Sequence, residues 1–254
     1  MLPFIHIGPI ALPTYGLFVA IGILVGFFVL QKDLLRRGLS ADPSVIIGVT
    51  AFAGLVGSRI YFLLETPQEF FANPWPQLFS TMGFTFTGAA LAGAIALILI
   101  ARHYRIPILQ MLDIASPAAA IGYGFGRIGC LISGDGDYGV PTSLPWGMSF
   151  PNGLVPTTER VHPTPIYEFL AAVVIFWILW RLGARWLNDK RDFGKLFGMY
   201  LLLSGVARFL VEIIRINPRV LWGLTNAQLA SIAYVIVAAF LLLRSPRSSN
   251  PQRA

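Results

Sequence analysis

Charged residues are scarce in this sequence. Only 12% of the 254 residues are Asp, Glu, Lys or Arg, whereas 56% are hydrophobic and the mean hydropathy is +0.69. A water-soluble chain of this length could not bury so much apolar surface. There is also a single cysteine, which excludes an internal disulfide and a thiolate metal cluster. We therefore expect an integral membrane protein, and we predict neither a metal ion nor a cofactor.

Long apolar runs stand where a soluble protein would have charges. Each approaches the roughly 20 residues needed to cross a bilayer. Because backbone in lipid must satisfy its own hydrogen bonds, each run is predicted to be a helix. We predict an all-α integral membrane protein of one domain, 1–254. Its seven transmembrane helices are expected near 14–31, 45–64, 84–101, 108–125, 165–182, 196–214 and 225–243.

The basic residues are unevenly placed along the chain. Thirteen of the 19 fall in three loops and a C-terminal tail that share one side of a seven-helix arrangement. This bias is typical of cytoplasmic segments, and it argues against nucleic acid as the reason for the net charge of +7. It predicts an N-terminus outside the cytoplasmic membrane, residues 183–195 inside, and a disordered cytoplasmic tail at 244–254. No cleaved signal peptide is expected, because Lys32, the first basic residue, follows the first apolar run.

The largest polar region separates the fourth and fifth predicted helices. Residues 126–163 are rich in Gly and Pro and are expected to form a small head of turns and short strands outside the membrane. The first part, 126–139, holds Arg127, Asp135 and Asp137 among five glycines. Glycines let a backbone approach a ligand closely, and the planar arginine fork suits a phosphate. The alternative is a tight polar loop in which the aspartates pair with Arg127.

Two further stretches place charges near the same outer boundary. His162 and Glu168 flank the start of the fifth helix. Arg208, Glu212 and Arg215 share one face of the sixth helix. Arginines within lipid imply an anion, and the anions at that depth are phospholipid headgroups. The sequence therefore predicts an anionic lipid substrate; a structural histidine and an Arg208–Glu212 pair that only ties helices together are the alternatives.

Some single residues allow two interpretations. Tyr15 begins the first helix and is typical of an interfacial belt, with a substrate contact as the alternative. Arg59 lies in the second helix, where it either snorkels to the headgroups or faces a polar site. Cys130 is predicted to be a buried structural thiol, because a thioether formed on it would be a very poor leaving group. The aromatic segment 65–82 is expected to lie on the outer leaflet.

The ordered set of motifs resembles the prolipoprotein diacylglyceryl transferase family over nearly the whole chain. The motifs are Thr14-Tyr15-Gly16-Leu17, Gly57-Ser-Arg-Ile-Tyr61, Gly126-Arg-Ile-Gly129, His162-Pro-Thr-Pro-Ile-Tyr-Glu168, Arg208-Phe-Leu-Val-Glu212 with Arg215, and Gln228. The resemblance implies a seven-helix membrane enzyme of the bacterial inner membrane. Such an enzyme moves diacylglycerol from phosphatidylglycerol to the lipobox cysteine of a prolipoprotein and releases glycerol 1-phosphate.

The resemblance also implies site residues, with phosphatidylglycerol, lipobox-containing prolipoproteins and the bilayer as partners. Arg127 and Arg208 are expected to contact the lipid phosphate and stabilise its developing charge. The predicted catalytic residues are Arg208, His162, Asp135 and Glu168. The predicted substrate-binding residues are Arg127, Tyr15, Arg59, Gly129, Asp137, Gly139, Glu212 and Arg215.

The sequence departs from the family pattern at several positions. Thr87 stands where the third helix of the family has a histidine. In the glycine-rich stretch, Cys130 and Ser133 replace two asparagines, Asp135 replaces a glutamate, and one residue is added before Gly139. A divergent member with another acceptor is therefore an alternative. A lipid transporter is another, although no inverted repeat is seen; a scaffold without chemistry would leave the intramembrane arginines unexplained.

Overall fold

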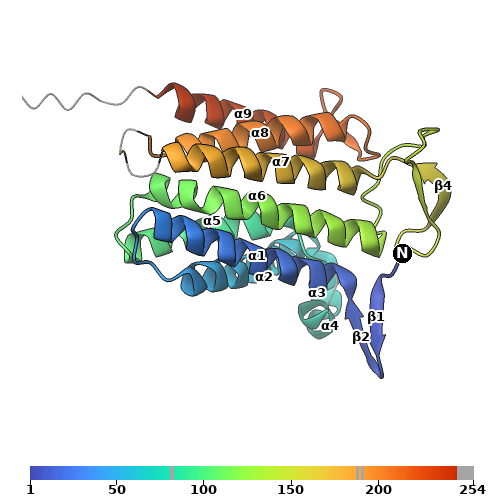
Figure 1. Ribbon diagram of the computed structural model, residues 1–254. Coiled ribbons are helices and arrows are strands. Elements are labelled where there is room, and N and C mark those ends of the chain that lie inside the picture. Colours follow the sequence, from blue (N-terminus) through green and yellow to red (C-terminus); the bar gives the residue numbers. More distant parts are fainter. Residues whose placement is uncertain (81–82, 187–188, 190–191, 245–254) are drawn as a thin grey trace, which may run out of the picture. The chain divides into compact units, whose positions relative to one another are not determined.

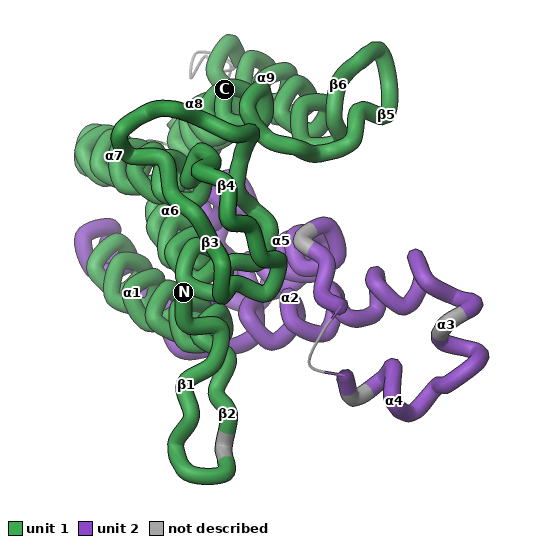
Figure 2. Tube along the Cα trace, turned by 90° about the vertical axis from the view of Figure 1, so that its right-hand side faces the viewer, with its two compact units in different colours: residues 1–33, 113–254 green, residues 34–112 purple. Residues whose placement is uncertain are grey.

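A computed structural model describes residues 1–80, 83–186, 189 and 192–244 (Figure 1). Residues 245–254, which make up most of the predicted tail, lie outside the described residues. The chain divides into two compact units, coloured separately in Figure 2. Unit 1 comprises residues 1–33 and 113–254, and unit 2 comprises residues 34–112.

The described chain is mostly helical. The longer helices are α1 (Thr14–Arg36), α2 (Pro43–Glu65), α5 (Phe86–His103), α6 (Ile108–Ser133), α7 (Thr164–Arg185), α8 (Lys195–Glu212) and α9 (Asn226–Leu243). Each of the predicted runs overlaps one of them. By length and composition, α1, α2, α7 and α9 can cross a membrane, and α5 is apolar but shorter. The prediction of a helical, multi-pass membrane protein is confirmed.

Short elements join these helices. They are the two helices α3 (Pro67–Ala72) and α4 (Pro74–Phe79), and the strands β1 (Phe4–Ile7), β2 (Ile10–Pro13), β3 (Met148–Phe150), β4 (Thr157–Val161), β5 (Arg219–Leu221) and β6 (Leu224–Thr225). The strands pair as three antiparallel hairpins, β1–β2, β3–β4 and β5–β6. An all-α description therefore omits small β-elements, which all lie between helices or at the N-terminus.

In unit 1, α7 packs against α8 and α8 against α9. Ala120 of α6, Leu179 of α7 and Leu196 of α8 are buried together in the apolar core between these helices. Asp113 of α6 fixes the start of α8, because its two carboxylate oxygens accept 2.7 Å hydrogen bonds from the backbone N–H groups of Gly194 and Phe197. A carboxylate at a helix N-terminus satisfies otherwise unpaired donors.

The head between α6 and α7 begins later than predicted. We expected it from Gly126, but α6 continues to Ser133, so the first eight residues of that stretch are helical. Gly129 serves helix packing there, because a Cβ at this position would lie 3.2 Å from the side chains of Tyr15 and Phe18 on α1. The head itself has a small core in which Tyr138 stacks on Phe150, with ring centroids 4.9 Å apart.

Candidate functional site

Several charged residues of unit 1 gather where α6, α7 and α8 meet the head. Arg127 lies near the end of α6, Glu168 near the start of α7, and Arg208 and Glu212 near the end of α8. Arg215, which we expected on the same helix face, lies beyond the end of α8 at Glu212. These helix ends lie on the same side as the β3–β4 hairpin in Figure 1. The three stretches that the sequence analysis expected to converge therefore do meet. We use the name arginine cluster for six of their charged residues, Arg127, Asp137, Glu168, Arg208, Glu212 and Arg215.

Glu168 is the buried centre of the arginine cluster. Its Oε1 accepts hydrogen bonds from Arg208 Nη1 at 2.5 Å and from the Tyr123 hydroxyl at 2.6 Å. Its Oε2 lies 3.4 Å from Arg215 Nη1 and 3.6 Å from Arg127 Nη1. The side chain is only 3% exposed. One carboxylate thus holds three guanidinium groups, which would otherwise repel one another.

Glu212 anchors the arginine cluster from the other side. Its Oε2 lies 2.9 Å from Arg208 Nη2, and its side chain is fully buried. Its Oε1 accepts hydrogen bonds from Asn217 Nδ2 at 2.6 Å and from Thr225 Oγ1 at 2.9 Å. These neutral donors hold the Glu212 carboxylate in place. The carboxylate in turn fixes the orientation of the Arg208 side chain.

Asp137, which lies in the head, is the third carboxylate of the arginine cluster. Its carboxylate accepts hydrogen bonds from Arg127 Nη1 and Arg215 Nη2. Burial raises its pKa, but Arg127 and Arg215 lower it by more, so that the pKa lies below its ordinary value. The carboxylate is therefore ionised at neutral pH. Its side chain is 31% exposed, which makes it the most accessible acid of the arginine cluster.

Asp135 and Cys130 lie beside the arginine cluster. Burial raises the pKa of the Asp135 carboxyl above its ordinary value, and Asp135 Oδ1 accepts a hydrogen bond from the backbone N–H of Asp137 at 3.2 Å. Cys130 is 7% exposed, and Arg127 Nη1 lies 3.9 Å from its sulfur. The potential ligand atoms of Cys130, Asp135 and Asp137 lie within 4.8 Å of one another. A cation there would compete with two guanidinium groups for Asp137, so we assign no metal site.

His162 belongs to a different set of contacts. Its Nδ1 lies 3.2 Å from the Tyr167 hydroxyl, which accepts a 2.8 Å hydrogen bond from Trp146 Nε1. Its backbone oxygen accepts a hydrogen bond from the Gly139 N–H at 2.9 Å. Within the described part of the chain, the structure gives His162 no ion pair with the arginine cluster. A Cβ at Gly139 would lie 2.6 Å from the Ile214 carbonyl oxygen, so this position requires glycine for close packing.

Of the other predicted site residues, Tyr15 borders the arginine cluster and Arg59 lies elsewhere. Tyr15 is 46% exposed on α1, where it packs against Gly129 of α6 and lies within electrostatic reach of Arg127 and Asp137. Arg59 belongs to unit 2, in which its Nη1 donates a 2.9 Å hydrogen bond to the Gly83 carbonyl oxygen. Its guanidinium lies 5.5 Å from the ring centroids of Phe62 and Phe84.

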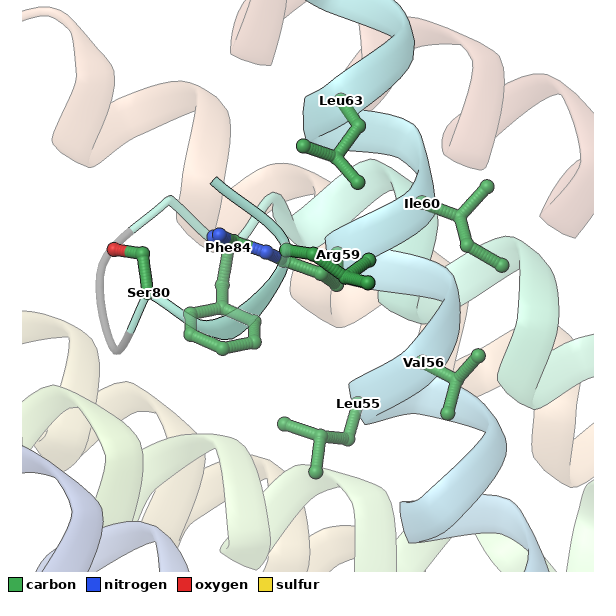
Figure 3. A pocket seen from close by; sticks show the side chains of 8 residues that line it. Leu55, Val56, Arg59, Ile60, Leu63, Ser80 and Phe84 are labelled. Carbon is green, nitrogen blue, oxygen red and sulfur yellow. The ribbon is translucent and has the colours of Figure 1, made fainter. Parts of the chain in front are cut away.

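The Arg59 side chain also lines a cavity of about 330 Å³ (Figure 3). The other lining residues are mostly apolar: Leu55, Val56, Ile60, Leu63, Leu78, Ser80 and Phe84. Thr87, which stands at the position of the family's histidine, is an exposed residue of α5 in the same unit.

The sequence analysis missed Tyr123. Its hydroxyl donates to Glu168, and its ring centroid lies 4.9 Å from the Arg127 guanidinium carbon. Tyr123 precedes Arg127 by four residues, the spacing that puts two side chains on one helix face. From this spacing, Tyr123 could have been predicted to lie on the same helix face as Arg127.

Comparison with known proteins shows the family of this chain. A family model described as "Prolipoprotein diacylglyceryl transferase" matches residues 3–244. A protein of Rickettsia rickettsii is 33% identical over 256 residues, with 94% of each chain covered. One of Clostridium tetani is 32% identical over 236 residues, covering 89% of this chain and 90% of the relative. Both are named phosphatidylglycerol–prolipoprotein diacylglyceryl transferase. With nearly its whole length matched, the chain belongs to the prolipoprotein diacylglyceryl transferase family.

Proposed function

We propose that this protein transfers the diacylglyceryl group of phosphatidylglycerol to the lipobox cysteine of a prolipoprotein and releases glycerol 1-phosphate. The arginine cluster is the observation that carries this proposal. Arg127, Arg208 and Arg215 converge from three segments of an apolar chain. Bringing three cations together in such a chain is costly even with carboxylates to balance them, which points to a site that binds an anionic substrate.

The reaction needs little more than charge stabilisation and one proton acceptor. The cysteine thiolate attacks a glycerol carbon, so that a carbon–sulfur bond forms while the bond from that carbon to the phosphate oxygen breaks. Negative charge develops on the departing phosphate. Arg127 and Arg208, together with Arg215, would donate hydrogen bonds to it, and preoriented donors of this kind are a major source of rate enhancement. Glu168 and Glu212 would hold these arginines in position.

Asp135 is the strongest candidate for the proton acceptor. In the described structure its carboxylate forms none of the arginine ion pairs that engage Asp137 and Glu168. Its raised pKa brings it closer to that of an effective general base at physiological pH. His162 remains the second candidate, held by Tyr167 at the edge of the head.

We also propose the orientation in the bacterial inner membrane. All seven long helices would cross the bilayer, with the N-terminus and the head outside and the C-terminus in the cytoplasm. The clustering of basic residues in the loops after α1, α5 and α7 supports this orientation. In this arrangement the arginine cluster would lie at the depth of the outer headgroups, where phosphatidylglycerol presents its phosphate.

Transfer from labelled phosphatidylglycerol to a lipobox peptide by the purified protein tests the proposal. Arg127→Lys and Arg208→Lys keep the charge but lose the planar fork, so transfer should fall strongly while the protein stays folded in detergent. Arg181→Lys is a matched control, because Arg181 is exposed on α7 and stacks on Trp177. Normal transfer in both cluster variants would refute the phosphate site, and lipid movement without a thioether product would favour a transporter.

A further inference from the structure

The charges of the arginine cluster are already balanced without a substrate. Its three arginines are linked to three carboxylates, those of Asp137, Glu168 and Glu212. An additional phosphate would make the arginine cluster net negative. A buried cluster with unbalanced charge is strongly disfavoured. A phosphate can therefore bind here only if one of the three carboxylates moves away from the arginines.

Asp137 differs from the other two carboxylates in ways that single it out. Its side chain is 31% exposed, whereas those of Glu168 and Glu212 are 3% and 0% exposed. Both glutamates lie on helices and also accept hydrogen bonds from neutral side chains, Tyr123 for Glu168 and Asn217 and Thr225 for Glu212. Asp137 lies in the head and spans Arg127 and Arg215 with one oxygen each. A phosphate would bind in the same way, with one oxygen accepting hydrogen bonds from each of the two guanidinium groups.

The backbone around Asp137 is held firmly. Its carbonyl oxygen accepts a 2.6 Å hydrogen bond from Thr164 Oγ1. The next residue, Tyr138, is 6% exposed and donates a 2.5 Å hydrogen bond to the Val155 carbonyl oxygen. The carboxylate can therefore leave the arginines by rotation of its own side chain toward solvent, without movement of the head.

We propose that Asp137 is an exchangeable internal anion: it occupies the phosphate position between Arg127 and Arg215, and the lipid phosphate displaces it. This inference rests on the proposed function. The charges match, because the cluster gains one net positive charge when Asp137 turns away, and a phosphodiester carries one negative charge. After transfer, the phosphate monoester product carries up to about two negative charges and would be held more tightly. Return of Asp137 would displace that product.

Binding and kinetics of Asp137→Asn in the full-length protein test this proposal. Asparagine keeps the shape but not the charge, so short-chain phosphatidylglycerol should bind about tenfold tighter. In the transfer assay KM should fall, and kcat should fall with it because glycerol 1-phosphate leaves more slowly and inhibits more strongly. Asp137→Ser, which also removes the charge, provides a second variant if Asp137→Asn does not fold. Glu159→Gln, at an exposed position of strand β4, is the control for loss of one negative charge in the head.

The outcomes separate this inference from the proposed function. Tighter binding in Asp137→Asn but not in Glu159→Gln supports the exchange. If wild type binds phosphatidylglycerol better than phosphatidylcholine, but folded Asp137→Asn and Asp137→Ser bind it equally or more weakly, the exchange is refuted while the site stands. If wild type shows no preference for phosphatidylglycerol, the proposed site itself is wrong.

Discussion

At the scale of single residues, the arginine cluster shows how an apolar protein keeps several cations together. Glu168 contacts all three arginines, and Glu212 and Asp137 complete the balance. The sequence analysis had posed a choice between a phosphate site and arginines paired with carboxylates. The geometry contains the carboxylate pairs, yet one of these carboxylates, that of Asp137, is 31% exposed and belongs to the head. The two interpretations are thus compatible, since a site can hold its own anion until the substrate arrives.

Cys130 is expected to be structural. It is buried next to Arg127 and Asp135, and as a nucleophile it would form a thioether that could not transfer the lipid onward. Cys130→Ala should therefore keep most of the transferase turnover and lose some thermal stability in detergent. Complete loss of turnover in a folded Cys130→Ala protein would instead show that the thiol takes part in the chemistry.

Asp135 should make stability depend on pH. Burial raises the pKa of the Asp135 carboxyl in the folded protein, so ionisation of this group at neutral pH lowers the free energy of unfolding. This loss of stability disappears as the pH falls toward the pKa of an aspartate in the unfolded chain, about 4. Asp135→Asn should therefore unfold at a higher temperature than wild type at pH 7, with a smaller difference at pH 4. Asp137→Asn should show the opposite sign at pH 7, because the pKa of Asp137 is lowered. A difference for Asp135→Asn that does not change with pH would contradict this assignment.

At the scale of elements, unit 2 depends on the close approach of α2 and α5. A Cβ at Gly88 would lie 2.3 Å from the Gly57 carbonyl oxygen and 2.5 Å from the Tyr61 Cβ, both on α2. Gly88→Ala should therefore destabilise the protein by about 1–3 kcal/mol through overpacking. Gly93→Ala on the same helix is the control, because its nearest neighbour would be the Thr50 Cγ2 at 3.6 Å. Equal unfolding midpoints for the two variants would show that the helices can separate without cost.

At the scale of the whole molecule, the charge bias predicts the topology. Ser143, in the head, and Ser40, in the loop between α1 and α2, are both exposed. In a Cys130→Ser background, a membrane-impermeant maleimide added to intact cells should label Ser143→Cys and leave Ser40→Cys unlabelled until the membrane is opened. The reverse pattern would invert the proposed orientation.

Much of the molecule follows from sequence alone. The apolar runs located the long helices, because a helix is the solution for continuous apolar backbone in lipid. The ordered motifs led to the family, which the comparisons confirmed. The start of the head was misplaced, since glycine density at Gly126 and Gly129 resembles a loop, while both residues lie within α6 and Gly129 allows that helix to pack closely on α1.

The partners of the charged residues were decided by the tertiary structure. Sequence spacing gave the Arg208–Glu212 pair, because residues four apart share a helix face. No spacing could show that Glu168, 40 residues before Arg208, accepts its hydrogen bond, or that Asp137 and not Asp135 bridges Arg127 to Arg215. Those contacts depend on how α6, α7 and α8 pack and on the turn of the head, and local sequence does not encode such distances. Sequence thus determined which charges the protein buries, and packing determined which anion each arginine holds.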